Sequence, residues 1–179
     1  MKPTFAILAA LLATAVVTPA SAELKAGAKA PDFTAPAYLS GQPFTFKLAD
    51  ALKKGPVVLY FFPAAYTKGC QIETHEFSEA IDKFKAQKAT VIGVTAGNTE
   101  KLAEFSKDTE YCAGKFPMAA DAGAVIAKTY DAANPTRPTS NRSSFVIAQN
   151  GEVTSVYSNP APEGHITATL DALTAMKKK

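Results

Sequence analysis

Cys70 has the surroundings that a nucleophilic cysteine requires. It follows Gly69 and a short loop that begins at Pro63, and the residues after it have helical spacing. A cysteine attacks as its thiolate, and positive potential favours that form. The first turn of a helix supplies such potential through its free N–H groups and its dipole. We therefore expect Cys70 to act as a nucleophile from the first turn of a helix.

Residues near Cys70 in the sequence could form a pocket around its sulfur. Thr67, three residues earlier, can direct its hydroxyl at the thiolate or at a bound oxygen. Gly69 lets the backbone bend and leaves room for a small substrate beside the sulfur. Glu73, three residues later, can accept from the N–H groups of the first turn or hold a guanidinium in place. We expect Gly69 and Glu73 to contact the substrate.

An arginine would complete this pocket, because a guanidinium stabilises both a thiolate and a developing oxyanion. Arg137 and Arg142 are the only arginines in the sequence. Arg142 stands at the start of an apolar stretch with the character of a strand, and the end of that strand could face the helix of Cys70. Arg137 is followed by a proline and is expected to be a loop residue.

The first 22 residues have the pattern of a cleavable signal peptide. Lys2 gives a basic start, residues 5–17 form an apolar run, and Ala20 and Ala22 frame a small-x-small cleavage site. A membrane span needs about 20 apolar residues, more than this run provides. We expect cleavage after Ala22, export to the periplasm and a single domain over residues 23–179. The alternative, an apolar helix of the core, is disfavoured because no acidic residue precedes Glu23.

Composition excludes several classes of function. The formal net charge is +3, and much of the excess lies in the lysine tail 177–179, so no nucleic-acid partner is expected. His75 and His165 lack partners at ligand spacing, so no metal site is expected. No cysteine of the kind that carries a lipid stands near the cleavage site, so no membrane anchor is expected.

The pattern of apolar residues predicts alternating strands and helices. Residues 26–42 suggest an extended segment with turns, and 48–54 a short helix or turn. Strands are predicted at 57–62, 90–96, 116–118, 144–148 and 153–157, the last two joined by a turn at Asn150-Gly151; helices are predicted at 70–88, 98–108, 123–130 and 163–176. This order predicts an α/β fold with a mixed sheet and helices on both faces. A thioredoxin-like arrangement fits, although the pattern leaves a flavodoxin-like one open.

Four separated motifs resemble the peroxiredoxins, which form the alkyl hydroperoxide reductase/thiol-specific antioxidant superfamily. They are Pro63 with Thr67-x-Gly69-Cys70-x-x-Glu73, Ala30-Pro31-Asp32-Phe33, Arg142-Ser143-Ser144-Phe145-Val146-Ile147, and Asn150-Gly151. The resemblance runs from about residue 26 to the C-terminus. The loop is most similar to the Q-type, or bacterioferritin-comigratory, branch.

The resemblance implies a thioredoxin-like three-layer fold and a thiol peroxidase without a cofactor. Cys70 would be the peroxidatic cysteine, Thr67 and Arg142 would activate the thiolate and the peroxide, and Pro63 would shield the thiolate. The substrate would be hydrogen peroxide or a small alkyl hydroperoxide, and the reductant a thioredoxin-like or other thiol. The protein would be a monomer or a homodimer.

The sequence departs from the Q-type pattern at the resolving position. Many Q-type proteins carry a resolving cysteine five residues after the nucleophile, where this sequence has His75. Tyr66 and Lys68 also differ from the usual loop, and Lys68 adds positive charge near Cys70. Some family members resolve with a cysteine in a later helical region, which makes Cys112 the candidate resolving residue. The first turn around Cys70 would then have to unwind.

Other roles for the two cysteines stay open. Cys112 could be a free thiol, with an external thiol resolving Cys70. An even number of cysteines in an exported chain is also typical of a structural disulfide, which would make the protein a stapled, non-catalytic domain. A thiol–disulfide oxidoreductase of the same fold would need a Cys-x-x-Cys pair, and Thr67 stands at its first position.

Overall fold

The structure is a computed structural model that describes residues 24–178. The predicted signal peptide, residues 1–22, lies outside the described residues. Among the described helices, none is both long enough and apolar enough to cross a membrane.

A seven-stranded mixed sheet forms the middle layer of the described chain, in the order β2-β1-β5-β4-β3-β6-β7. Its central strand is β3 (Val57–Phe61), all of whose side chains are buried, as predicted for a continuous apolar run. β3 pairs in parallel with β4 (Thr90–Thr95) and antiparallel with β6 (Ser143–Ile147). β5 (Met118–Ala120) continues the sheet beside β4, and β7 (Val153–Ser158) beside β6.

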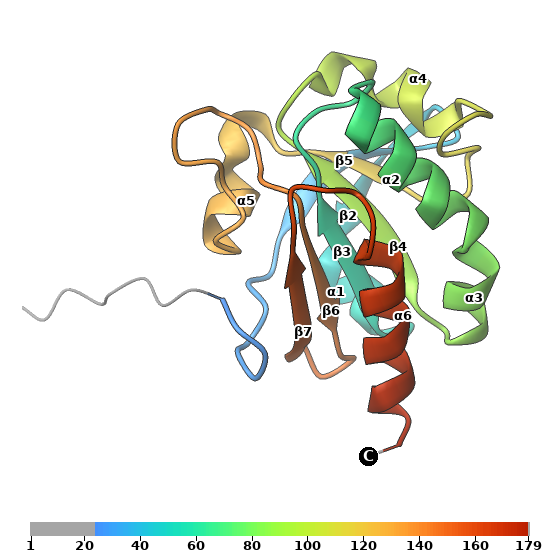
Figure 1. The fold of residues 1–179 in the computed structure, drawn as a ribbon, viewed down its shortest axis with the longest axis vertical. Helices are drawn as coiled ribbons and strands as arrows, with labels where there is room; N and C mark the ends of the chain where they lie inside the picture. The colour runs from blue at the N-terminus through green and yellow to red at the C-terminus, as the bar shows by residue number, and fades with distance from the viewer. Residues whose placement is uncertain (1–23, 179) are drawn as a thin grey trace, which may run out of the picture.

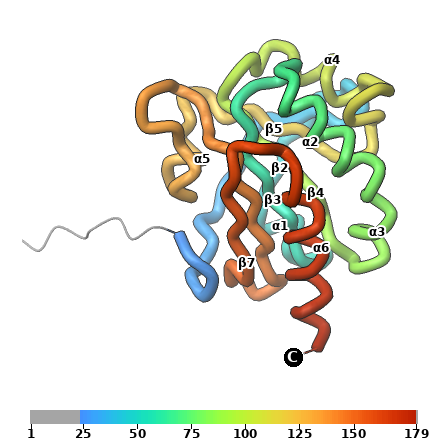
Figure 2. The backbone as a smooth tube through the Cα atoms, viewed as in Figure 1, coloured from blue at the N-terminus to red at the C-terminus, as the bar shows by residue number. Residues whose placement is uncertain are grey.

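Helices cover both faces of this sheet (Figures 1 and 2). One face carries α2 (Lys68–Glu79), α3 (Ile81–Ala86), α4 (Leu102–Lys107) and α6 (His165–Met176); the other carries α1 (Leu48–Leu52) and α5 (Val125–Thr129). Successive side chains of a strand point to opposite faces. Accordingly, Val58 and Tyr60 pack with the first group of helices, whereas Leu59 and Phe61 pack with the second. The predicted three-layer α/β fold is confirmed.

A β-hairpin occupies the region that the sequence suggested was an extended segment with turns. β1 (Thr34–Leu39) pairs antiparallel with β2 (Gln42–Lys47). Ser40 and Gly41 form the turn with φ of 51° and 79°, the left-handed values of a two-residue hairpin turn. The buried residues of β1 are small alanines, so its alternation was too weak to predict a strand.

Several predicted boundaries also differ from the structure. The predicted helix 70–88 begins two residues earlier and is divided at Ala80 into α2 and α3. The predicted helix 123–130 shortens to α5, because Gly123 and Ala124 have φ of 74° and 56° and cannot continue a right-handed helix. β5 lies later than the predicted strand 116–118.

The register of the sheet brings two distant segments to one edge. Phe61, the last residue of β3, pairs with Ser143, the first residue of β6. The loop that leads from β3 into α2 therefore lies beside Arg142, which precedes β6. This pairing places the predicted nucleophile and the predicted arginine at the same edge of the sheet.

Candidate active site

Cys70 lies in the first turn of α2, as predicted, and is fully buried. Thr67 is the N-terminal capping residue of α2 and has extended backbone angles, φ −91° and ψ 146°. Its hydroxyl oxygen lies 2.9 Å from the Cys70 Sγ and 3.1 Å from the carbonyl oxygen of Ala64. A hydroxyl has one proton, so Thr67 can donate it either to the sulfur or to the carbonyl.

Arg142 is held on three sides and presents its guanidinium to the sulfur. Its Nη2 lies 3.6 Å from the Cys70 Sγ, Nη1 donates to the carboxylate of Glu73, and Nε donates to the carbonyl of Pro160 at 3.0 Å. The side chain is 6% exposed. The planar guanidinium thus reaches three groups through three separate nitrogens, a spread that the one nitrogen of an ammonium does not have.

Glu73 is fully buried and forms an ion pair with Arg142. Of the two roles considered for it, capping the first turn or holding a guanidinium, the structure shows the second. Burial raises the pKa of Glu73 to about 8, although the neighbouring charge of Arg142 lowers it. A carboxyl group in this environment holds a proton more readily than an exposed one.

Gly69 makes room for the arginine. A Cβ atom at this position would lie 3.0 Å from the Arg142 Nη2. Gly69 lies inside α2 and is not among the glycines with positive φ, so the expected special bend is absent. Gly69 and Glu73 both lie against the side chain of Arg142. Their contact with the substrate stays a prediction.

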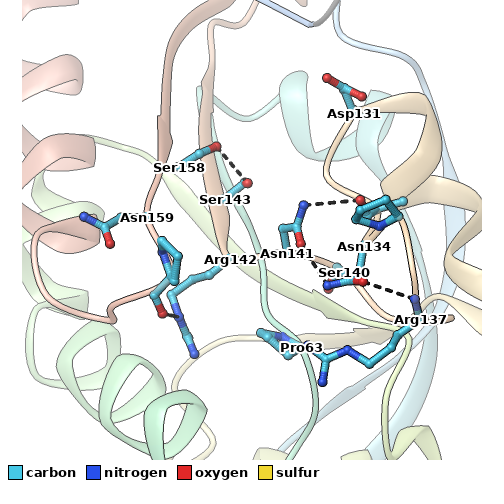
Figure 3. Close-up of a pocket in the computed structure, with 13 residues that line it drawn as sticks. Pro63, Asp131, Asn134, Arg137, Ser140, Asn141, Arg142, Ser143, Ser158 and Asn159 are labelled. Atoms are coloured by element: carbon cyan, nitrogen blue, oxygen red, sulfur yellow. Dashed lines mark hydrogen bonds between the residues drawn. The ribbon is translucent and has the colours of Figure 1, made fainter.

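A polar pocket of about 740 Å³ opens beside this site (Figure 3). Pro63 and Arg142 line it, together with Asn134, Arg137 and Asn141 from the loop that precedes β6. Arg137 is a loop residue, as expected, but it also faces this pocket. The proline that follows it, Pro138, predicted a loop but did not indicate that the arginine would line a pocket. Tyr60, by contrast, is a core residue, stacked on Phe77 with ring centroids 4.3 Å apart.

Cys112 is a second buried and free thiol, located after α4. Its Sγ donates to the carbonyl of Phe116 at 3.3 Å, and burial raises the pKa of this thiol to about 11. The two sulfurs therefore have separate partners in this structure. His75 is exposed on α2, and its Nδ1 lies 2.8 Å from the carbonyl oxygen of Glu110.

His165 contacts the site although the sequence suggested no partner for it. It is fully buried at the start of α6, and its Nδ1 lies 3.6 Å from the Glu73 Oε1. The same nitrogen lies 2.8 Å from the hydroxyl of Ser144. The sequence held one signal of this contact. Two polar residues, Ser143 and Ser144, stand next to an apolar run, which indicates that a polar side chain packs against them.

Comparisons with known proteins agree with this geometry. Residues 26–156 match the AhpC/TSA family. The chloroplastic peroxiredoxin Q of Sedum lineare is 32% identical over 144 residues, which cover 75% of this chain and 76% of that protein. A putative peroxiredoxin bcp of Helicobacter pylori is 28% identical over 157 residues, covering 84% of this chain and 99% of that protein. The crystal structure of the peroxidoxin BcpB from Mycobacterium tuberculosis has a TM-score of 0.76 at 27% identity, over 86% of this chain and 98% of that one.

Proposed function

Because the chain belongs to the AhpC/TSA family and is a thiol-dependent peroxidase of the peroxiredoxin kind with a thioredoxin-like fold, we propose that Cys70 is its peroxidatic cysteine. One observation carries this assignment. The Sγ of Cys70 lies in the first turn of α2, 2.9 Å from the Thr67 hydroxyl and 3.6 Å from the Arg142 guanidinium. Donors at these positions stabilise a thiolate and the oxygen atoms that react with it.

In the first step the Cys70 thiolate attacks the terminal oxygen of the peroxide. A sulfur–oxygen bond forms and the oxygen–oxygen bond breaks, which leaves Cys70 as a sulfenic acid. The departing oxygen takes up a proton and leaves as water or as an alcohol. Arg142 and Thr67 donate to the oxygens as negative charge moves from the sulfur to the leaving atom. Pro63 lines the adjoining pocket together with Arg142, and we assign to it the role of shielding the thiolate.

The pocket beside Arg142 supports hydrogen peroxide and small organic hydroperoxides as substrates. Its volume of about 740 Å³ exceeds what hydrogen peroxide alone requires, so the substituent of a small organic hydroperoxide can lie there. Asn134, Asn141 and Arg137 give the pocket a polar lining. We assign the role of positioning Arg142 to Glu73 and Gly69.

In the second step we assign resolution to Cys112. Its sulfur attacks the sulfenic sulfur of Cys70, a disulfide forms and water leaves; an external thioredoxin-like thiol then reduces the disulfide. Both thiols are buried, and disulfide formation requires Cα atoms within about 7 Å. Because the two sulfurs have separate partners, we expect the first turn of α2 to open and Cys112 to leave the carbonyl of Phe116. His75 at the usual resolving position of the Q-type branch leaves Cys112 as the only other cysteine.

We propose the periplasm as the site of action. The support is the leader itself, with its basic start, its apolar run 5–17 and its small-x-small cleavage site ending at Ala22. A Gram-negative envelope is the compartment that fits such an export signal without a lipid-bearing cysteine.

The assignment of Cys70 is tested by intact mass after a single addition of peroxide. The reduced protein receives one molar equivalent of hydrogen peroxide and is quenched within about one second. We expect a transient gain of about 16 Da at Cys70, followed by a net loss of about 2 Da when the disulfide forms. Cys70→Ser serves as the control and should keep its mass. An unchanged mass in the unaltered protein would overturn the assignment.

Replacing Cys112 by serine tests the resolving step. Cys112→Ser should still gain about 16 Da with peroxide, but the loss of about 2 Da should disappear because no second sulfur attacks the sulfenic acid. Turnover with a thioredoxin-type reductant is expected to fall. Turnover that survives unchanged with the same reductant would favour the one-cysteine mechanism, with an external thiol resolving Cys70.

A further inference from the structure

Glu73 has a buried oxygen that the site described so far does not satisfy. Its Oε2 accepts from Arg142, whereas Oε1 has no hydrogen-bond partner among the described residues. A buried carboxylate oxygen without a partner costs free energy, so its surroundings usually supply a donor. The Nδ1 of His165 lies 3.6 Å from this oxygen.

The contacts of His165 restrict where its protons can be. Its Nε2 lies 3.1 Å from the carbonyl oxygen of Asn159, and only a protonated nitrogen can bond to a carbonyl. In a neutral ring Nδ1 is then an acceptor, and Ser144 can donate to it at 2.8 Å. A neutral ring in this form has no N–H that could donate to the Glu73 Oε1. One additional proton between Nδ1 and Oε1 would satisfy that oxygen, and because Nδ1 has a single lone pair, the Ser144 hydroxyl then no longer donates to it.

We propose that His165 is a positioning residue of the peroxidatic site, which shares one proton with Glu73 and thereby leaves the charge of Arg142 available to Cys70. This inference rests on the proposed role of Cys70. With the proton present, the Glu73–His165 pair carries no net charge and Arg142 can stabilise the thiolate and the departing oxygen. Without it, the carboxylate neutralises Arg142, and the thiolate faces an ion pair of no net charge.

The surroundings of the pair determine when the proton is lost. Burial raises the pKa of Glu73 to about 8, and burial together with the charge of Arg142 lowers the pKa of His165, so the pair holds its proton mainly on the carboxyl side. The proton is therefore retained below about pH 8 and lost above it. The other titratable or charged groups around the pair are Cys70 and Glu76 on α2, Tyr60 on β3, Arg142 before β6, and Tyr157 on β7.

The unaltered protein should consequently react more slowly with peroxide at alkaline pH. The rate declines there as the pair loses its proton. Two substitutions of His165 should move the alkaline decline in opposite directions. His165→Asn places an amide N–H near the former Nδ1, where it can donate to an ionised Oε1. His165→Leu leaves Oε1 against an apolar side chain.

A donor to the ionised carboxyl lowers its pKa and an apolar environment raises it, by roughly one unit in each case. We expect the alkaline decline to shift by about one pH unit downward in His165→Asn and upward in His165→Leu. At pH 7 the asparagine variant should then react about twofold more slowly, and the difference should approach about tenfold only above about pH 8. The measurement is the rate of Cys70 oxidation under excess hydrogen peroxide between about pH 5 and pH 9.5, quenched and followed by intact mass.

Thr169→Val is the matched control, since Thr169 is buried on the same helix and its hydroxyl bonds to the backbone carbonyls of His165 and Ile166 rather than to the side chain of Glu73 or His165. Its pH profile should equal that of the unaltered protein. The proposal would be overturned if the rate of Cys70 oxidation declined at the same alkaline pH in all four proteins. It would also be overturned if the rate did not decline in the unaltered protein. If His165→Leu fails to fold, the shift in His165→Asn still decides it. A protein that does not react at Cys70 at any pH would refute the proposed function instead.

Discussion

Arg142→Met is expected to slow the reaction of Cys70 with hydrogen peroxide by about 10²–10³-fold, the usual cost of removing a donor to a developing oxyanion. In the folded protein Arg142 is the charged group that contacts the Cys70 sulfur, at 3.6 Å from Nη2. Methionine has a similar length but supplies neither charge nor donors. The second-order rate constant, measured by quenching and intact mass, should therefore fall while the binding of thiol reductant is unaffected.

Two further variants separate the geometry of the arginine from its charge. Arg142→Lys keeps the charge but cannot reach Cys70, Glu73 and Pro160 together, so its rate constant should lie between those of the methionine variant and the unaltered protein. Lys85→Met removes a positive charge from an exposed ion pair on α3 and should leave the rate constant unchanged. Equal rate constants for Arg142→Met and Lys85→Met would exclude Arg142 from the reaction.

The parts of the site that could be predicted from the sequence are those fixed by local structure. Thr67, Gly69 and Cys70 are consecutive or nearly so, and a loop followed by a helix places them together whatever the rest of the fold does. Arg142 was predictable for a different reason. It directly precedes a strand, and pairing of that strand with β3 leaves little freedom in where the residue before it lies.

The parts that escaped prediction depend on contacts between residues far apart in the chain. His165 meets Glu73 only because α6 packs on the same face of the sheet as α2, and no spacing in the sequence encodes that packing. Arg137 reaches the pocket through an irregular loop, whose path periodicity does not describe. The β1–β2 hairpin was missed because its inward residues, Ala35 and Ala37, are too small to mark a buried face.

At about pH 9, where Glu73 is ionised, Glu73→Leu is expected to reduce the free energy of unfolding by about 3–5 kcal/mol, the typical cost of breaking a buried ion pair by removing one partner. Glu73 is fully buried, and its loss leaves the guanidinium of the buried Arg142 without its carboxylate. Glu73→Gln is the matched variant. Its amide oxygen can still accept from Arg142 and its N–H groups face His165, as a protonated carboxyl would, so it should lose much less stability.

Urea unfolding of the reduced proteins, followed by circular dichroism, measures these differences. The double variant Glu73→Leu/Arg142→Leu should be more stable than Glu73→Leu alone, because it removes the uncompensated charge as well as its partner. Equal stability of Glu73→Leu and the unaltered protein would mean that the pair contributes nothing to folding. Glutamine cannot lose a proton as Glu73 does above about pH 8. If the glutamine variant is stable and Cys70 still oxidises rapidly above that pH, the protonated form of Glu73 is the one that serves the reaction.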